Sequence, residues 1–146
     1  MAYKIAIFNM KGGVGKSATA TNLADGLSRF KRKQVLLVDI DPQGTSGASL
    51  GIEVWKLEVQ LKDVLQSETP SERKQLLKQA IVPVCDNRVD VLPSNILLAV
   101  EELQISGLPG RENLLKRLLA EIDAEYDFIL IDCPPNIGVF SINALK

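Results

Sequence analysis

A glycine-rich segment at residues 11–17, Lys-Gly-Gly-Val-Gly-Lys-Ser, carries the clearest chemistry in the chain. It follows the apolar run at residues 5–8, and the segment from 18 to 30 that comes after it is predicted to be helical. Glycines let the backbone curl tightly, so that several N–H groups converge on one anion. Lys16 adds a positive charge, and Ser17 offers a hydroxyl to a magnesium ion. The sequence therefore predicts a phosphate-binding loop at a helix N-terminus.

This loop departs from the general phosphate-binding pattern in two ways. The pattern G-x-x-x-x-G-K-[ST] places a glycine five residues before Gly15, where the chain has Met10. The chain also has an additional lysine, Lys11, which has no function in an ordinary loop of this kind. A solvated side chain is one interpretation of Lys11. Approach to a phosphate, in its own subunit or across a dimer, is the other.

Carboxylates follow two further apolar runs. Asp132 comes directly after Phe-Ile-Leu-Ile, the position of a Walker B aspartate. Asp39 lies near the end of the run at 34–40, and Asp41 directly follows that run. Magnesium prefers oxygen ligands and keeps several waters, so we expect Ser17, Asp39 and Asp132 to lie near the metal. Asp132 has an alternative interpretation as a residue that hydrogen-bonds its own turn, and Asp41 as a turn aspartate before proline.

Asp41 is the best candidate for the residue that orients an attacking water. It lies in a loop between the strand end and Gly44, and Pro42 restricts its backbone. The two-residue spacing from Asp39 predicts that both carboxylates point to the same face.

The remaining pattern alternates short apolar runs with helical periodicity, which predicts an α/β fold with a mostly parallel sheet and helices on both faces. Ligands in such sheets bind at the carboxyl ends of the strands, where the segments 9–17, 39–44 and 132–138 would meet. Ser71 is expected to cap the helix predicted at 72–80. Strands are predicted at 4–9 (buried on both faces), 34–40, 88–92 and 128–131, and helices at 18–30, 62–66, 72–80, 96–103, 112–122 and from 139 onward, with no clear periodicity at 45–59.

Composition narrows the class of protein. The chain has 146 residues, a net charge of −1, two cysteines and no histidine, and we expect residues 1–146 to form one nucleotide-binding domain. The absence of histidine excludes His-ligated zinc and Ser-His or Cys-His catalysis. Cys85 and Cys133 form no C-x-x-C pattern and indicate a reducing cytoplasm. No apolar run is long enough to span a membrane. The basic run 31–33 is interpreted as a helix C-terminus rather than a DNA patch.

The three segments together resemble the ParA family of partition ATPases, within the deviant Walker A group that includes MinD. Residues 11–17 resemble the deviant Walker A motif, with Lys11 at the signature lysine. Residues 39–44, Asp-Ile-Asp-Pro-Gln-Gly, resemble switch I, and residues 131–135 resemble the Walker B strand and switch II. Similar patterns also occur at 92–95 and 141–145. The resemblance thus implies a P-loop NTPase fold.

The resemblance also implies ATP and Mg²⁺ as cofactors. It assigns catalytic functions to Lys11, Lys16 and Asp41, and metal functions to Ser17, Asp39 and Asp132, with Asp132 acting through the metal's water shell. The nucleotide would be bound by Lys11, Gly12, Gly13, Val14, Gly15, Lys16, Ser17 and Ala18.

Family members form an ATP-dependent homodimer in which the signature lysine reaches the partner's nucleotide. The dimers bind DNA without sequence preference, a ParB-like partner stimulates hydrolysis, and the cycle positions cargo such as plasmids. The resemblance therefore implies a cytoplasmic protein that is nucleoid-associated when ATP-bound and does not bind membranes. Family members continue well beyond residue 146, so this chain is expected to be C-terminally truncated, with the basic DNA-binding surface in the missing part.

Two alternatives remain open at this point. A reductase of the nitrogenase iron-protein type shares the deviant loop, but it needs cysteines that bridge an iron–sulfur cluster between subunits. A nucleotide-binding fragment without turnover is the other alternative. Measured ATP turnover separates it from an ATP-driven switch.

Overall fold

The computed structural model describes residues 1–86 and 88–146 and is built around one five-stranded sheet. The strands lie in the order β1-β5-β2-β4-β3. The first four of these pair in parallel, and β3 is antiparallel to β4. The predicted mostly parallel sheet is therefore confirmed. The strands are β1 (Tyr3–Ile7), β2 (Val35–Asp39), β3 (Val82–Val84), β4 (Val89–Leu92) and β5 (Phe128–Asp132).

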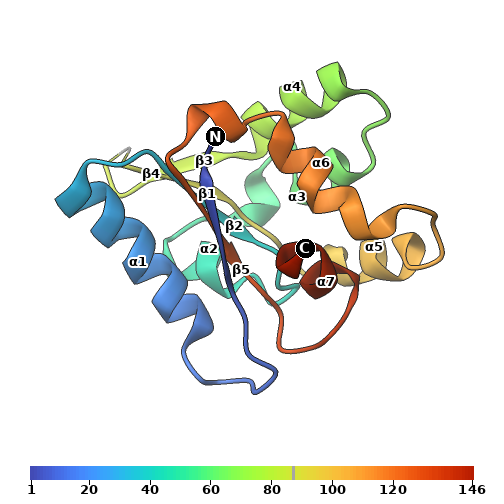
Figure 1. Cartoon of the computed structure of the whole chain (residues 1–146), viewed down its shortest axis with the longest axis horizontal. Coiled ribbons are helices and arrows are strands. Elements are labelled where there is room, and N and C mark those ends of the chain that lie inside the picture. Colours follow the sequence, from blue (N-terminus) through green and yellow to red (C-terminus); the bar gives the residue numbers. More distant parts are fainter. Residues whose placement is uncertain (87) are drawn as a thin grey trace.

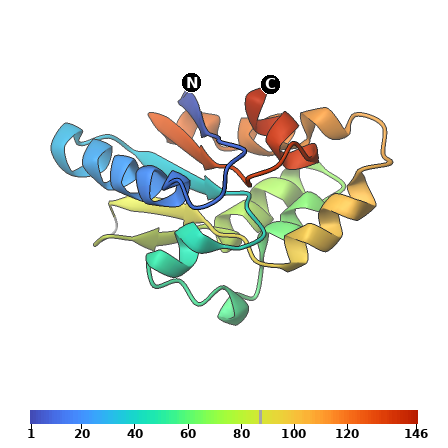
Figure 2. The ribbon, with the colours of Figure 1, turned by 90° about the horizontal axis from the view of Figure 1, so that it is seen from below.

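Helices cover both faces of this sheet, as the sequence predicts. Figure 1 shows α1 on one side of the strands and α3 to α7 on the other, and Figure 2 keeps the same separation after a rotation of 90°. The α-helices are α1 (Lys16–Lys31), α2 (Thr45–Ser49), α3 (Leu61–Leu65), α4 (Pro70–Ala80), α5 (Leu97–Ile105), α6 (Leu114–Ala120) and α7 (Val139–Leu145), and the 3₁₀ turns are η1 (Val54–Lys56), η2 (Arg111–Asn113) and η3 (Asp123–Glu125).

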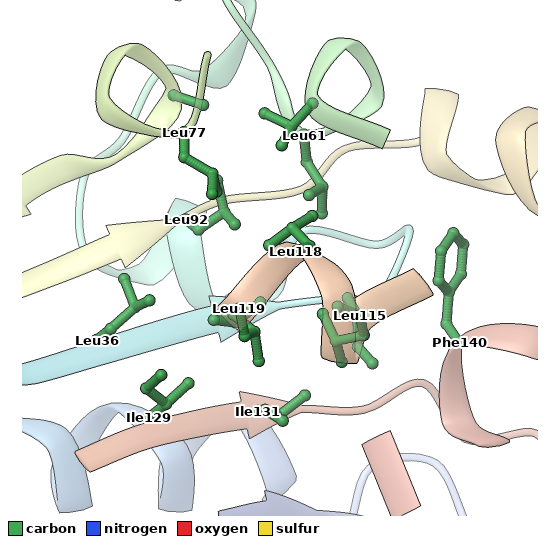
Figure 3. Packing of buried hydrophobic residues seen from close by; sticks show 14 of the residues in the cluster. Leu36, Leu61, Leu77, Leu92, Leu115, Leu118, Leu119, Ile129, Ile131 and Phe140 are labelled. Carbon is green, nitrogen blue, oxygen red and sulfur yellow. The ribbon is translucent and has the colours of Figure 1, made fainter. Parts of the chain in front are cut away.

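Alternate residues of the strands point to opposite faces of the sheet and pack into two separate hydrophobic cores. On the α1 face, the helix packs Ala20 and Ala24 against the strands. On the opposite face, leucines of α6 pack on Leu36, Ile129 and Ile131 (Figure 3). Full burial of one leucine side chain contributes about 1.5–3 kcal/mol. Packing on both faces holds the strands in place. The strand ends therefore form a rigid base for a site built from the loops that follow them.

The predicted strand at 4–9 is present, but the prediction that both of its faces are buried is wrong. Tyr3 and Ile5 are exposed, because β1 is the edge strand of the sheet and the described helices leave much of it uncovered. Strand β3 was not predicted. It has three residues, with Pro83 at its centre, and in the described part of the chain it pairs with β4 alone, an edge position that tolerates proline.

Helix boundaries differ from the sequence expectation at three points. The cap of α4 is Thr69 rather than Ser71, because Pro70 fits the first helical position and the Thr69 hydroxyl accepts the Glu72 N–H at 3.2 Å. The predicted helix at 112–122 narrows to α6 between two 3₁₀ turns. The segment 45–59, without periodicity, contains α2 and η1.

The interpretation of the basic run 31–33 as a helix C-terminus is confirmed. Helix α1 ends at Lys31, and Arg32 takes a left-handed conformation whose N–H donates to the Leu27 carbonyl. Within residues 1–86 and 88–146, no helix combines the length and the apolar character that a membrane crossing requires.

Candidate functional site

The three chemistry-bearing segments meet at one edge of the sheet. Strand β5 lies between β1 and β2, and its last residue, Asp132, is the register partner of both Ile7 and Asp39. The loops after β1 and β5 therefore leave the sheet at the same end, as Figure 1 shows. This arrangement confirms the convergence that the parallel-sheet rule predicts.

The loop between β1 and α1 has the backbone of an anion site. Gly15 is the N-cap of α1 and has a left-handed φ of 91°. An added Cβ at Gly15 would meet no atom within 4 Å, so the backbone conformation, rather than crowding, requires glycine here. The 16-residue helix α1 begins directly at Lys16, and its first N–H groups and dipole favour a negative charge.

A cleft of about 480 Å³ lies over this loop. Asp41 reaches it from the end of β2, and Pro135 from the end of β5. The residues that line it are Gly12, Gly13, Gly15, Lys16, Ser17, Ala18, Asp41, Gln43, Thr45 and Pro135. Seven of the residues singled out in the sequence therefore share one cleft with residues from all three loops.

The remaining four predicted site residues lie outside the cleft lining. Lys11 is exposed, and its carbonyl accepts from the Lys16 Nζ at 3.4 Å. Val14 is also exposed. Asp39 and Asp132 are fully buried at the ends of β2 and β5. In the part of the chain that the structure describes, neither Lys11 nor Lys16 forms a salt bridge with a carboxylate.

Asp39 and Asp41 occupy different environments despite their two-residue spacing. The Asp39 carboxylate accepts the N–H of Asp41 at 3.0 Å through Oδ1, and the N–H of Ser46 at 3.1 Å through Oδ2. Both of its oxygens therefore accept N–H groups of the segment that follows β2, one from the loop and one from α2. The Asp41 carboxylate accepts the Gln43 N–H at 2.9 Å and lines the cleft.

The buried carboxyl groups of Asp39 and Asp132 lie in an unusual electrostatic environment. Burial, reinforced by the nearby Asp132 carboxylate, raises the pKa of Asp39 to about 7. Asp132 Oδ2 accepts the Ser46 hydroxyl at 2.6 Å. Among the described residues, Asp132 Oδ1 is buried without any hydrogen-bond partner. An orphaned carboxylate oxygen beside a phosphate loop is a group that still needs a donor or a cation.

The oxygen groups present fit a magnesium ion that also binds phosphate. Magnesium takes one or two carboxylates or hydroxyls, keeps several waters and uses substrate phosphates as further ligands. Ser17, which lines the cleft, and Asp132, whose Oδ1 has no hydrogen-bond partner among the described residues, supply oxygen groups of this kind. No group of three or more His, Cys, Asp or Glu that could form a complete metal cage occurs within residues 1–86 and 88–146.

The structure adds two residues to which the sequence analysis assigned no function, although Ser94 lies in the family-like segment 92–95. Ser46 contacts both buried carboxylates. Ser94, just after β4, donates its hydroxyl to the Asp41 carbonyl. An added Cβ at Gly44 would lie 2.6 Å from the Ser94 carbonyl oxygen, so the two loops are in close contact. The Pro-Ser-Asn sequence at 93–95 was the available signal for Ser94, whereas Ser46 lies in the segment without periodicity.

The cysteines do not suit a cluster shared between subunits. Cys133 is fully buried, and burial, followed by the Asp132 charge, raises the pKa of its thiol to about 12. Cys85 lies between β3 and β4, away from the carboxyl ends of the parallel strands. A bridging cluster needs accessible thiolates on one face.

Comparison with known proteins gives consistent results. Residues 2–146 match the family model AAA_31, described as an AAA domain. The sporulation initiation inhibitor protein Soj of Bacillus subtilis is 43% identical over 97% of this chain and 53% of its own length. The chromosome partitioning protein ParA of Myxococcus xanthus is 38% identical over 97% of this chain and 47% of its own length.

A solved structure agrees with the fold. The cobyrinic acid a,c-diamide synthase of Mycobacterium smegmatis, with bound ATP analog and magnesium, superimposes with a TM-score of 0.88 at 38% identity. The match covers 99% of this chain and 55% of that protein. The chain thus spans about half the length of the relatives that it matches.

Proposed function

The chain belongs to the AAA domain family AAA_31 and to the ParA-type partition ATPases within it. From this premise we propose that it binds ATP with magnesium and hydrolyses the ATP slowly. The hydrolysis would act as a switch that positions DNA or another cargo. The observation that carries the proposal is the single cleft in which Lys16 and Ser17 of the phosphate loop face Asp41 from a neighbouring strand end.

Each residue has a distinct function in this proposal. Backbone N–H groups of residues 11–18 bind the phosphates, and Lys16 neutralises the β- and γ-phosphates. The Ser17 hydroxyl binds the metal, and Asp132 accepts hydrogen bonds from the metal's waters. A bound magnesium ion would supply charge neutralisation for the phosphoryl group.

Asp41 and Asp39 are proposed to have different functions, one in the loop after β2 and one at the end of β2. Asp41, which lines the cleft, accepts a proton or hydrogen bond from the attacking water and orients it. Asp39 lies near the metal and holds the loop that carries Asp41, through the Asp41 and Ser46 amides. A misplaced loop would therefore reduce turnover more than nucleotide binding.

Lys11 is proposed to act across an ATP-dependent homodimer. Its side chain is exposed and does not line its own cleft, so it is available to a partner's nucleotide. A second copy that brings its Lys11 to the phosphates would complete the site. This makes dimerisation depend on bound nucleotide.

The cellular function follows from the partition relatives. Soj and ParA are named for sporulation control and chromosome partitioning. We propose a cytoplasmic cycle of the same kind, nucleoid-associated when ATP is bound. In it, residues beyond the matched half contact DNA without sequence preference and a ParB-like protein stimulates hydrolysis.

Measured phosphate release tests the proposal and separates a switch from a binding fragment without turnover. The wild-type chain should release phosphate from ATP slowly and only with Mg²⁺. Asp41→Ala should bind a non-hydrolysable ATP analogue with unchanged affinity but release phosphate at least about 100-fold more slowly. Equal turnover by both proteins would refute the assignment of Asp41, and binding without turnover by the wild type would leave only the binding function.

A further inference from the structure

Ser46 lies between the two buried carboxylates at the ends of β2 and β5. Its backbone N–H donates to Asp39 Oδ2 at 3.1 Å, and its hydroxyl donates to Asp132 Oδ2 at 2.6 Å. The Ser46 residue is itself fully buried. One residue therefore hydrogen-bonds both of the neighbouring buried carboxyl groups.

The local backbone explains why Ser46 reaches this position. Gly44 has a φ of 62° and starts α2, so the chain turns back over the end of β2 within two residues. The first N–H groups of a helix have no partner within the helix. Those of Ser46 and Gly47 point to Asp39, at 3.1 and 3.4 Å, and the Ser46 side chain is then directed toward Asp132.

The contact fixes which oxygen of Asp132 is available. Because the Ser46 hydroxyl occupies Oδ2, Oδ1 is left buried and without a partner among the described residues. From this geometry we infer that Ser46 is a positioning residue, which orients Asp132 Oδ1 toward the water shell of the nucleotide-bound magnesium. The inference rests on the function proposed above, in which Asp132 accepts from that shell.

The same contact ties the loop after β2 to the metal-associated carboxylate. Residues 41–44 lie between Asp39 and α2, and Asp41 lines the cleft. A shift of this loop that moves Ser46 also removes the donor from Asp132. Ser46 thereby links the position of the hydrolytic residue Asp41 to the affinity for magnesium.

The affinity for Mg²⁺ itself tests this inference. Mg²⁺ would be titrated into the protein saturated with a fluorescent, non-hydrolysable ATP analogue. Ser46→Ala should weaken the apparent Mg²⁺ affinity about tenfold, as residues that orient metal ligands commonly do. Its affinity for the analogue in EDTA should stay within about twofold of wild type. Ser46→Thr, which keeps the hydroxyl, should restore the Mg²⁺ affinity.

Two controls separate positioning from a general effect on the fold. Ser49→Ala, on the same short helix, removes a hydroxyl whose one hydrogen bond among the described residues is to the Ser46 carbonyl, and it should behave as wild type. In an Asp132→Asn background, Ser46→Ala should add little further loss, because the carboxylate that it positions is absent.

Specific outcomes would overturn the inference. The first is an unchanged Mg²⁺ affinity in Ser46→Ala. The second is an equal loss of analogue binding in EDTA and in Mg²⁺. The third is full additivity of the Ser46→Ala and Asp132→Asn effects on Mg²⁺ affinity. A wild-type protein whose nucleotide binding ignores Mg²⁺ would instead refute the proposed function on which the inference rests.

Discussion

Asp39 and Asp132 lie opposite each other at the ends of adjacent parallel strands, and both carboxylates are fully buried. Two like charges in one buried place are unfavourable unless donors, a proton or a cation stabilise them. Here the donors are backbone N–H groups and the Ser46 hydroxyl. These hydrogen bonds therefore connect the segment after β2 to the ends of both strands.

The stability of the nucleotide-free protein should depend on pH through Asp39. Its pKa is raised from 3.8 to about 7 in the folded state, mainly by burial. Below about pH 4, Asp39 is protonated in both the folded and the unfolded state. Between about pH 4 and pH 7, it loses its proton in the unfolded state but keeps it in the folded state. The free energy of unfolding should therefore fall as pH rises through this window, by up to about 4 kcal/mol for three pKa units.

Urea unfolding at several pH values in EDTA measures this dependence. The Asp39→Asn variant lacks the titrating group and should show a flatter profile over the same window. Identical slopes for the variant and the wild type would show that Asp39 does not hold a raised pKa.

Two glycine substitutions should have opposite effects on stability. Gly44→Ala places a side chain at a φ of 62° with its Cβ 2.6 Å from the Ser94 carbonyl oxygen, and should destabilise the fold by about 2 kcal/mol or more. Gly26→Ala, inside α1 with no atom within 4 Å of the new Cβ, should stabilise by about 0.5–1 kcal/mol. Denaturant unfolding checks both, and a neutral Gly44→Ala would contradict the close packing of the two loops.

Lys11→Ala should separate nucleotide binding from dimerisation. The side chain is exposed and lies outside its own cleft, so monomer affinity for an ATP analogue should be unchanged. The analogue-dependent dimer should be lost, as seen by light scattering after size exclusion. Lys31→Ala, at the far end of α1, is the matched control and should still dimerise. A persistent dimer in Lys11→Ala would argue against a function across the interface.

The sequence was sufficient for the parts of the site that depend on strong local rules. Glycines before Lys16, and aspartates at the ends of apolar runs, follow from phosphate binding and from the parallel-sheet rule, and the cleft brings Lys16, Ser17 and Asp41 together. The different environments of Asp39 and Asp41 were not predicted, because the alternation of a strand no longer applies to Asp41, which lies beyond the last residue of β2. The functions of the individual residues stay predictions.

Other features depended on tertiary context. Ser46 was missed because α2 has only five residues and no periodicity to mark it. The exposure of β1 follows from its place at the sheet edge, which its apolar sequence does not reveal. Thr69 replaced Ser71 as a cap because the position of Pro70 decided where α4 begins.

Calorimetric titration of the protein with a non-hydrolysable ATP analogue and Mg²⁺ tests the central claim most directly. The account predicts Mg²⁺-dependent binding by the wild type and a loss of at least about 100-fold in Lys16→Ala, since a charged donor to the phosphates is removed from the cleft. Lys31→Ala should bind as the wild type does. Equal affinity of Lys16→Ala and the wild type, or no binding by either, would contradict the claim that these three loops form a nucleotide site.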